Sequence, residues 1–169
     1  RSVTTGFFLA MAGIASAVCI AGLGSAIGIS YAASAAAGVM SEDPKNFGKY
    51  LMLVALPGTQ GIYGFVISLL WMAQLNLMSD KALTSLSWNQ GLIVLFACLP
   101  VGICGLSAIY QGRACAAGVN LVAKRSEESA KALIMGVFVE FYAVLGLLVS
   151  IFVINFSDKI FAATKAVAN

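Results

Sequence analysis

Four long stretches of apolar sequence constrain this chain more than any other feature. They run from Gly6 to Met40, Tyr50 to Met78, Gly91 to Ala123 and about Ala130 to Phe156, so each has about 27 to 35 residues. A helix needs only roughly 20 apolar residues to cross the hydrocarbon core of a bilayer. With 60% hydrophobic and 10% charged residues, the chain also has too few polar side chains to cover a water-soluble domain of its size. The sequence therefore predicts an all-α membrane protein with four transmembrane helices that tilt or project beyond the bilayer.

Three short polar breaks separate these stretches, at residues 41–46, 79–90 and 124–129. Pro44 and the charges around it mark the first break as a tight turn, and Trp88 in the second is a candidate interfacial anchor. Basic residues are enriched on the cytoplasmic side of membrane proteins. Five basic residues flank the first and third breaks, and four lie at the opposite ends of the spans. We therefore expect these two turns in the cytoplasm and both termini on the other side of the cell membrane. The five are Lys45, Lys49, Lys124, Arg125 and Lys131, and the four are Arg1, Lys81, Lys159 and Lys165.

The polar residues exclude several classes of function. The basic residues are scattered along the chain, so no nucleic-acid partner is expected. The four cysteines match no zinc or redox spacing, and the chain has no histidine. It has neither a phosphate-binding loop nor a nucleophile paired with a base. We therefore do not expect this chain to be an enzyme by itself.

The two halves of the chain repeat each other. The tetrapeptide at residues 20–23 recurs at 103–106, an offset of 83, and the pentapeptide at 64–68 recurs at 146–150, an offset of 82. Such a repeat without inversion keeps both copies in the same orientation in the membrane. The sequence predicts two tandem helical hairpins, residues 1–80 and 81–169. At the second offset Gly58 stands in the place of Glu140, so only the second hairpin keeps a carboxylate.

Small and bulky residues divide the helices by role. Small residues recur at four-residue steps in the first helix, and a similar series marks the third. The two series in the first helix are Gly24, Gly28, Ala32 and Ala36, and Gly13, Ala17, Ala21 and Ser25. Such faces allow close packing in lipid. Because they occur on several sides of the first helix, they favour a tight homo-oligomeric ring, with an ordinary compact bundle as the alternative. Helices two and four carry bulky side chains expected to face lipid, namely Phe65, Leu69, Leu70, Trp71, Phe138, Phe141, Leu147 and Phe152.

Glu140 is the one acidic residue inside an apolar stretch, nine residues after Lys131. Two amide side chains share its depth, because Gln60 lies eleven residues beyond Lys49 and Gln111 lies thirteen before Lys124. At the helical rise these positions are roughly 14 to 20 Å along their helices. A carboxylate at such a depth is costly and indicates a function. A protonated acid with a structural hydrogen bond is the alternative.

Neutral oxygen atoms surround this level. Pro57 lacks an N–H and crowds the preceding turn, so carbonyl oxygens near it become available. Thr59 adds a hydroxyl, and Tyr63 adds a phenol one turn further on. Several neutral oxygens around one carboxylate suit a hard monovalent cation, and the pair of opposite charges lets the occupied site tolerate a low dielectric. A proton would need fewer partners, so the surplus of oxygens favours Na⁺, with H⁺ as the alternative ion.

At these residues the sequence resembles the duplicated membrane-ring proteolipid of V-type and A-type rotary ATPases, and most closely the bacterial sodium-translocating form. The resemblance covers the chain from about Gly6 to Asn155. It is carried by the decapeptide at residues 56–65 together with Gln111-Gly112 and the segment 139–142. Phe141 departs from the pattern, where a smaller polar residue is expected, and the tail from Ser157 to Asn169 runs past the usual end.

The resemblance implies a particular site and set of partners. The transported ion would be held by the main-chain oxygen of Leu56 and the side chains of Thr59, Gln60, Gln111 and Glu140, while Tyr63 would keep Glu140 in a closed conformation. Identical subunits would form a ring that turns in lipid against a stator subunit bearing a membrane arginine. The cytoplasmic turns would touch the central-stalk subunits, and transport would be coupled to ATP hydrolysis or synthesis elsewhere in the complex.

Two rival functions stay open at this point. A small dimeric, proton-coupled secondary transporter would explain the buried acid and the small-residue helices. It leaves the two amides, Thr59 and the proline break at one depth unexplained. A purely structural pore or junction protein would leave Glu140 without a role.

Overall fold

The computed structural model describes residues 3–42, 44–78 and 84–167. Every regular element in these ranges is helical, as predicted. In chain order they are α1 (Thr5–Met40), η1 (Pro44–Asn46), α2 (Phe47–Ala55), η2 (Leu56–Gly58), α3 (Thr59–Gln74), α4 (Trp88–Gly105), α5 (Ser107–Lys124), η3 (Ser126–Glu128) and α6 (Ser129–Val167), where η marks a short 3₁₀ helix.

Among the described residues, four helical segments are long and apolar enough to cross a membrane: Thr5–Met40, Pro44–Gln74, Trp88–Lys124 and Ser126–Ala163. They contain 31 to 38 residues, which is about 46 to 57 Å at the α-helical rise. The hydrocarbon core is only about 30 Å thick. The prediction of four membrane-spanning helices with overhanging ends is therefore confirmed.

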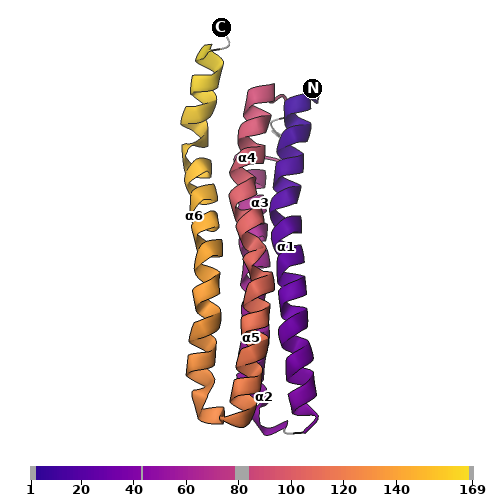
Figure 1. Ribbon diagram of the computed structural model, residues 1–169. Helices are drawn as coiled ribbons and strands as arrows, with labels where there is room; N and C mark the ends of the chain where they lie inside the picture. The colour runs from indigo at the N-terminus through magenta and orange to yellow at the C-terminus, as the bar shows by residue number, and fades with distance from the viewer. Residues whose placement is uncertain (1–2, 43, 79–83, 168–169) are drawn as a thin grey trace.

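The four segments stand side by side, with both chain ends at one end of the bundle and the turns after α1 and α5 at the other (Figure 1). The first and third breaks thus share one end, the turn end. Of the residues used to assign the sides, Arg1 and Lys81 lie outside the described residues, as does the side chain of Lys165. The boundary between the hairpin repeats at residue 80 lies outside them too and stays a prediction.

Two of the spans are interrupted. Pro57 lies in η2, so the second span changes from α to 3₁₀ geometry where the sequence predicted an opened hydrogen-bond ladder. The third span is interrupted at Leu106, between α4 and α5, which was not predicted. Here the chain is pressed against α1, because a Cβ added at Gly105 would lie 2.6 Å from the Cβ of Ala21.

The fourth helix extends to Val167, so the predicted end near Phe156 is wrong. The added turns pack against the end of α3. The ring of Phe161 stacks on Trp71 with 6.4 Å between centroids, and Gln74 Nε2 donates a hydrogen bond to Asp158 Oδ1 at 2.9 Å. Trp71, which also packs in the core with residues of α1 and α4, is fully buried rather than lipid-facing as predicted.

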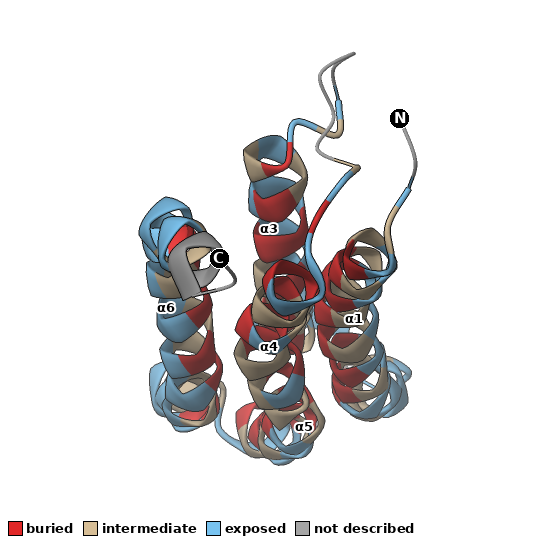
Figure 2. Ribbon diagram, turned by 90° about the horizontal axis from the view of Figure 1, so that it is seen from above, coloured by how far each residue is buried: buried red, intermediate tan, exposed pale blue. Residues whose placement is uncertain are grey.

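Small residues bring α1 close to the spans around it. It contacts α3, α4 and α5, and Figure 2 shows α1 and α6 on opposite sides of the third span. A Cβ added at Gly112 would lie 2.1 Å from the carbonyl oxygen of Gly28, and one at Gly64 would lie 2.4 Å from that of Ala17. These glycines permit contacts between helix backbones that any side chain would prevent.

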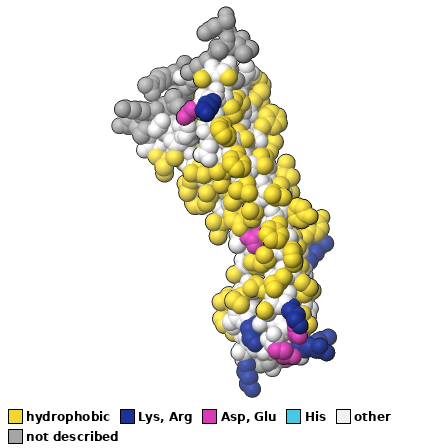
Figure 3. All heavy atoms as spheres, turned by 90° about the vertical axis from the view of Figure 1, so that its left-hand side faces the viewer, with side chains coloured by type: hydrophobic (Ala, Val, Ile, Leu, Met, Phe, Trp, Pro, Cys, Tyr) yellow, Lys and Arg dark blue, Asp and Glu magenta, His cyan; other side chains and the backbone are white. Residues whose placement is uncertain are grey.

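The surface of the bundle is largely hydrophobic between its ends. Figure 3 shows hydrophobic side chains over most of one face, basic and acidic groups gathered toward the turn end, and acidic atoms within the apolar middle. Most of the bulky residues predicted to face lipid are exposed: Phe65, Leu69, Leu70, Phe138, Phe141 and Phe152. Leu147 is only partly buried and packs against the interior. The exposed apolar surface matches a protein that resides in lipid.

Candidate ion-binding site

The proline break in the second span shapes one side of the site. In a regular helix the N–H of Gly61 would donate to the carbonyl oxygen of Pro57. It donates instead to Ser25 Oγ on α1, at 2.8 Å. Thr59 Oγ1 turns back and donates to the carbonyl oxygen of Leu56 at 3.1 Å. The break thus gathers the Leu56 carbonyl and the Thr59 hydroxyl at one point.

Glu140 on α6 reaches toward this point and has two hydrogen-bond donors. The phenol of Tyr63 donates to Oε1. The amide of Gln111 donates to Oε2 at 3.4 Å and, more closely, to the carbonyl oxygen of Gly136 at 3.1 Å. One donor comes from α3 and the other from α5, so three spans meet at this carboxylate.

Two buried glutamines connect Glu140 to the proline break. Gln60 Nε2 donates to Gln111 Oε1 at 2.5 Å, and Gln60 Oε1 accepts from Thr59 Oγ1 at 3.2 Å. Both amides are completely excluded from solvent. The Thr59 hydroxyl has one hydrogen, so it donates either to the Leu56 carbonyl or to Gln60 Oε1. Contacts of 3.4 Å or less therefore link Leu56, Thr59, Gln60 and Gln111 to the carboxylate.

The structure brings together every residue that the sequence singled out for ion binding. The set consists of Leu56, Thr59, Gln60, Gln111 and Glu140, with Tyr63 on the carboxylate and Pro57 buried in the break. The oxygen atoms that could bind a cation belong to a main-chain carbonyl, a hydroxyl, two amides and one carboxylate. Such hard, mostly neutral ligands suit an alkali cation. The phenol of Tyr63 can accept as well as donate, so it can also hold a protonated Glu140.

The carboxylate lies near the outer surface of the bundle. Glu140 is half-buried, and the neighbouring aromatic residues Phe138, Phe141 and Tyr142 are exposed on the same helix. In a membrane this surface faces hydrocarbon or another protein. Because a bare carboxylate is costly there, Glu140 must be protonated or paired with a cation whenever lipid covers it.

Sequence reasoning missed two residues that shape this site. Ser25 was grouped with small packing residues, yet its hydroxyl accepts the N–H released by the proline break. Gly136 lies one turn before Glu140, and an added Cβ would lie 2.8 Å from Leu56 Cδ2 and 3.0 Å from Cys115 Sγ. The spacing of four residues between Gly136 and Glu140 could have indicated a glycine on the site-facing side of α6.

A family model and several known proteins match this sequence. The family model described as the ATP synthase C subunit matches residues 12–71 and 95–153. The V-type sodium ATPase subunit K of Enterococcus hirae is 42% identical over 146 residues, covering 86% of this chain and 89% of that protein. The A-type ATP synthase subunit K of Methanocaldococcus jannaschii is 39% identical over 143 residues, covering 85% of this chain and 60% of that protein.

Proposed function

Since this chain belongs to the ATP synthase C-subunit family, we propose that its copies form the rotor ring of a V-type or A-type rotary ATPase and that each copy carries one Na⁺ at Glu140. The observation that carries the proposal is the pair of donors from α3 and α5 on one carboxylate of α6. These donors hold Glu140 close to the proline break, where the Leu56 carbonyl and the Thr59 hydroxyl can complete a cation site. H⁺ is the alternative ion.

The neutral oxygens favour Na⁺. A proton on Glu140 needs only one or two partners, whereas the Leu56 carbonyl, the Thr59 hydroxyl and the amide oxygens add several neutral ligands for a hard cation. A relative with 42% identity is named as a sodium ATPase subunit. Na⁺ and H⁺ would exclude each other, because both neutralise the same carboxylate.

The site would work in two states. Facing lipid, Glu140 is neutralised by its ion and held closed by Tyr63. Facing the stator, a fixed arginine there would accept the bare carboxylate, and the ion would leave through a water-filled path. Rotation of the ring would carry each site between the two settings and so move ions in one direction.

The turn end would face the cytoplasm and meet the central stalk. Lys49 Nζ ties the first and third turns together by donating to the carbonyl oxygen of Ser126 at 2.8 Å and to its hydroxyl at 2.7 Å. This contact would make the turns one stiff surface for a partner. ATP chemistry would take place on other subunits, and this chain would contribute ion transport alone.

The dimeric secondary transporter finds no support in the relatives, which are named as subunits of a V-type sodium ATPase and of an A-type ATP synthase. The mass of the assembly separates the two functions. A ring of many copies in mild detergent fits the rotor, and a dimer fits the transporter.

Carbodiimide labelling of the purified ring tests the ion and the residue together. A carbodiimide reacts with a protonated carboxyl in an apolar site, so it should modify Glu140 and leave the carboxylates at the turns unmodified. Millimolar Na⁺ should slow the reaction, and equal K⁺ serves as the control. Labelling that Na⁺ fails to slow at any pH would assign H⁺ as the carried ion, whereas labelling elsewhere would remove Glu140 from the site.

A further inference from the structure

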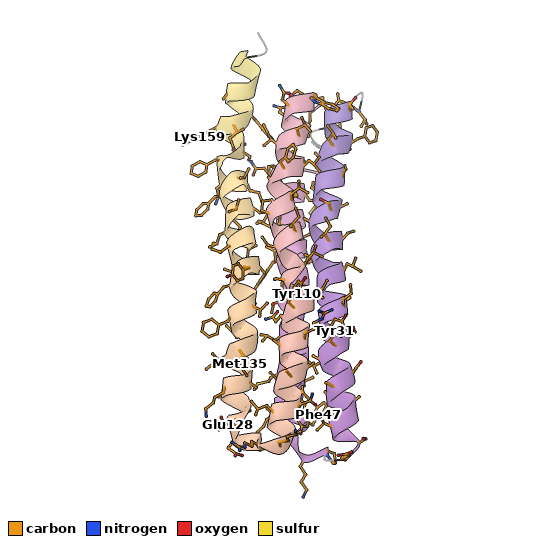
Figure 4. The ribbon with its side chains drawn as sticks, in the orientation of Figure 1. Tyr31, Phe47, Tyr110, Glu128, Met135 and Lys159 are labelled. Atoms are coloured by element: carbon orange, nitrogen blue, oxygen red, sulfur yellow. The ribbon has the colours of Figure 1, made fainter. Side chains whose placement is uncertain are left out.

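A buried hydroxyl near the ion site has no hydrogen-bond partner among the described residues. It is Oγ of Ser107, the first residue of α5. Tyr110, labelled near the middle of the bundle in Figure 4, follows it by three residues and marks this depth. Buried polar groups are nearly always paired, so an unpaired one needs an explanation. The other unpaired buried side chains in the described part of the chain lie further away, near the turn end (Tyr50) or toward the chain ends (Trp71, Thr84, Ser150 and Ser157).

The pairing of α5 with α3 places Ser107 beside Tyr63. Gln60 of α3 bonds Gln111 of α5, and the two helices run in opposite directions (Figure 1). Ser107 precedes Gln111 by one turn on the same face of α5, because residues four apart are neighbours on a helix surface. One turn from Gln60 in the same direction, toward the chain ends, α3 presents Tyr63 and Gly64.

The pairing of α5 with α6 leads to the same place. A Cβ added at Gly146 would lie 2.6 Å from the Cβ of Cys104, and Gln111 donates to Glu140 Oε2. Ser107 lies between Cys104 and Gln111 along the third span. It therefore faces α6 between Gly146 and Glu140, on the chain-end side of the carboxylate.

Tyr63 needs a second hydrogen-bond partner in a site that opens. In the closed site its phenol donates to Glu140 Oε1. When Glu140 turns toward the stator, as the proposed function requires, the phenol loses this acceptor inside an apolar bundle. A buried donor without a partner is costly, so the phenol alone would hold the site closed.

The other polar side chains near Tyr63 already have partners. Oγ1 of Thr59 is shared between a main-chain carbonyl and an amide oxygen, and Gln111 Oε1 accepts from Gln60 Nε2. A phenol that turned to either group would compete with these bonds. The hydroxyl of Ser107 can accept a hydrogen without breaking any of them.

We propose that Ser107 is the second partner of Tyr63, whose phenol donates to Ser107 Oγ whenever Glu140 opens to release its ion. Ser107 is thus a positioning residue, because it acts through Tyr63 and holds neither the ion nor the carboxylate. The inference rests on the proposed function, in which each site alternates between a closed and an open state. Ser107 stabilises only the open state, so its removal should slow ion release without weakening ion binding.

Release of bound Na⁺ from the purified ring tests the proposal. Rings of the full chain in mild detergent are loaded with radioactive Na⁺ and diluted into unlabelled Na⁺, and the retained label is followed by rapid filtration. Ser107→Ala should release Na⁺ about fivefold more slowly than the wild type, the ratio that one neutral hydrogen bond provides. The Na⁺ concentration that half-saturates the ring should not rise. Ser107→Thr keeps the hydroxyl and should release Na⁺ at nearly the wild-type rate.

Two further variants separate this role from a structural one. Ser150→Ala is the matched control, because it removes another buried, unpaired hydroxyl ten residues beyond Glu140, about 15 Å along α6. It should leave the release rate unchanged. Ser107→Ala combined with Tyr63→Phe should release Na⁺ no more slowly than Tyr63→Phe alone, because without the phenol the serine has nothing to accept. If the Ser107→Ala ring does not assemble, Ser107→Cys, with its weakly bonding thiol, should show the same slowing.

An unchanged release rate in Ser107→Ala would overturn the proposal. So would an equal slowing in the Tyr63→Phe background, since Ser107 would then act without the phenol, or a rise in the half-saturating Na⁺ concentration, which would place Ser107 in the closed site. The mass of the ring and the labelling of Glu140 are measured on the same preparations. A normal wild-type ring that binds Na⁺ but does not depend on Ser107 would refute the second partner alone, whereas a missing ring or one that binds no Na⁺ would refute the proposed function.

Discussion

The phenol of Tyr63 on α3 donates a hydrogen bond to Oε1 of Glu140 on α6, although 77 positions separate the two residues in the chain. Gln111, which lies between these two residues in the sequence, donates its amide N–H to the other carboxylate oxygen, Oε2. The carboxylate is thus held from two sides by groups that do not change its charge. This arrangement suits a site that must stay closed in lipid and open elsewhere.

Tyr63→Phe should weaken ion binding without disturbing the ring. The change removes one donor to a charged acceptor, which is worth about 1.5 to 3 kcal/mol. We expect the Na⁺ concentration that half-protects Glu140 from carbodiimide to rise at least about tenfold. Tyr142→Phe is the control, because Tyr142 is exposed two residues from Glu140. Equal shifts in both variants would show that the phenol at 63 has no special role.

The sequence could predict this site because helices have a fixed rise. Counting from the charged ends placed Gln60, Gln111 and Glu140 at one depth, and the structure brings them together. Their rotation about each helix could not be counted in this way. The site-facing role of Ser25 was missed for that reason, since a serine in a series of small residues looks like a packing residue.

Other features depend on contacts that a local pattern does not contain. The interruption at Leu106 lies where Gly105 meets Ala21 of α1, a contact between distant segments. Trp71 is buried in a core cluster with residues of α1 and α4, and Phe161 packs on it from a tail whose position the apolar pattern did not define. The length of the apolar stretches predicted the four spans, whereas these tertiary contacts decided where the helices break and end.

Ser25→Ala should loosen the proline break and weaken Na⁺ binding moderately. Without Ser25 Oγ, the N–H of Gly61 lacks its acceptor in an apolar setting, which costs about 1 to 3 kcal/mol. The break can relax to relieve part of that cost, and this would displace the Leu56 carbonyl and the Thr59 hydroxyl from the site. We expect the half-protecting Na⁺ concentration to rise about threefold to tenfold, which corresponds to about 1 kcal/mol of lost binding free energy.

Two further variants show whether the Ser25 effect is specific. Ser25→Thr keeps the hydroxyl and should restore binding at least in part. Ser30→Ala removes an exposed hydroxyl that donates to the Ile27 carbonyl of its own helix, so it should leave labelling unchanged. A wild-type response in Ser25→Ala would mean that the site does not depend on this contact.

Glu140→Gln should abolish ion transport while the ring still assembles. The amide keeps the shape of the side chain but has no negative charge. It cannot balance the charge of a bound cation, so the site should no longer carry an ion. The measurement is uptake of radioactive Na⁺ into vesicles that contain the whole complex, together with the mass of the ring. Glu128→Gln at the turn end is the control, since its ion pair with the exposed Lys131 side chain is worth little. Transport that persists in Glu140→Gln would remove this residue from the mechanism.

Gly112→Ala should destabilise the bundle strongly. The added Cβ would lie 2.1 Å from the carbonyl oxygen of Gly28 and 2.4 Å from its Cα, and both are backbone atoms that cannot rotate away. The two helices must separate, which breaks the packing of α1 on α5 and moves Gln111. Overpacking of this kind costs about 1 to 3 kcal/mol or more.

Gly38→Ala is the control, because nothing lies within 4 Å of its added Cβ, and alanine in a helix is favoured over glycine by up to about 1 kcal/mol. Thermal dissociation of the purified ring should therefore shift to lower temperature for Gly112→Ala and stay unchanged or rise for Gly38→Ala. Equal dissociation temperatures for the two variants would show that the contact between Gly28 and Gly112 does not limit the stability of the bundle.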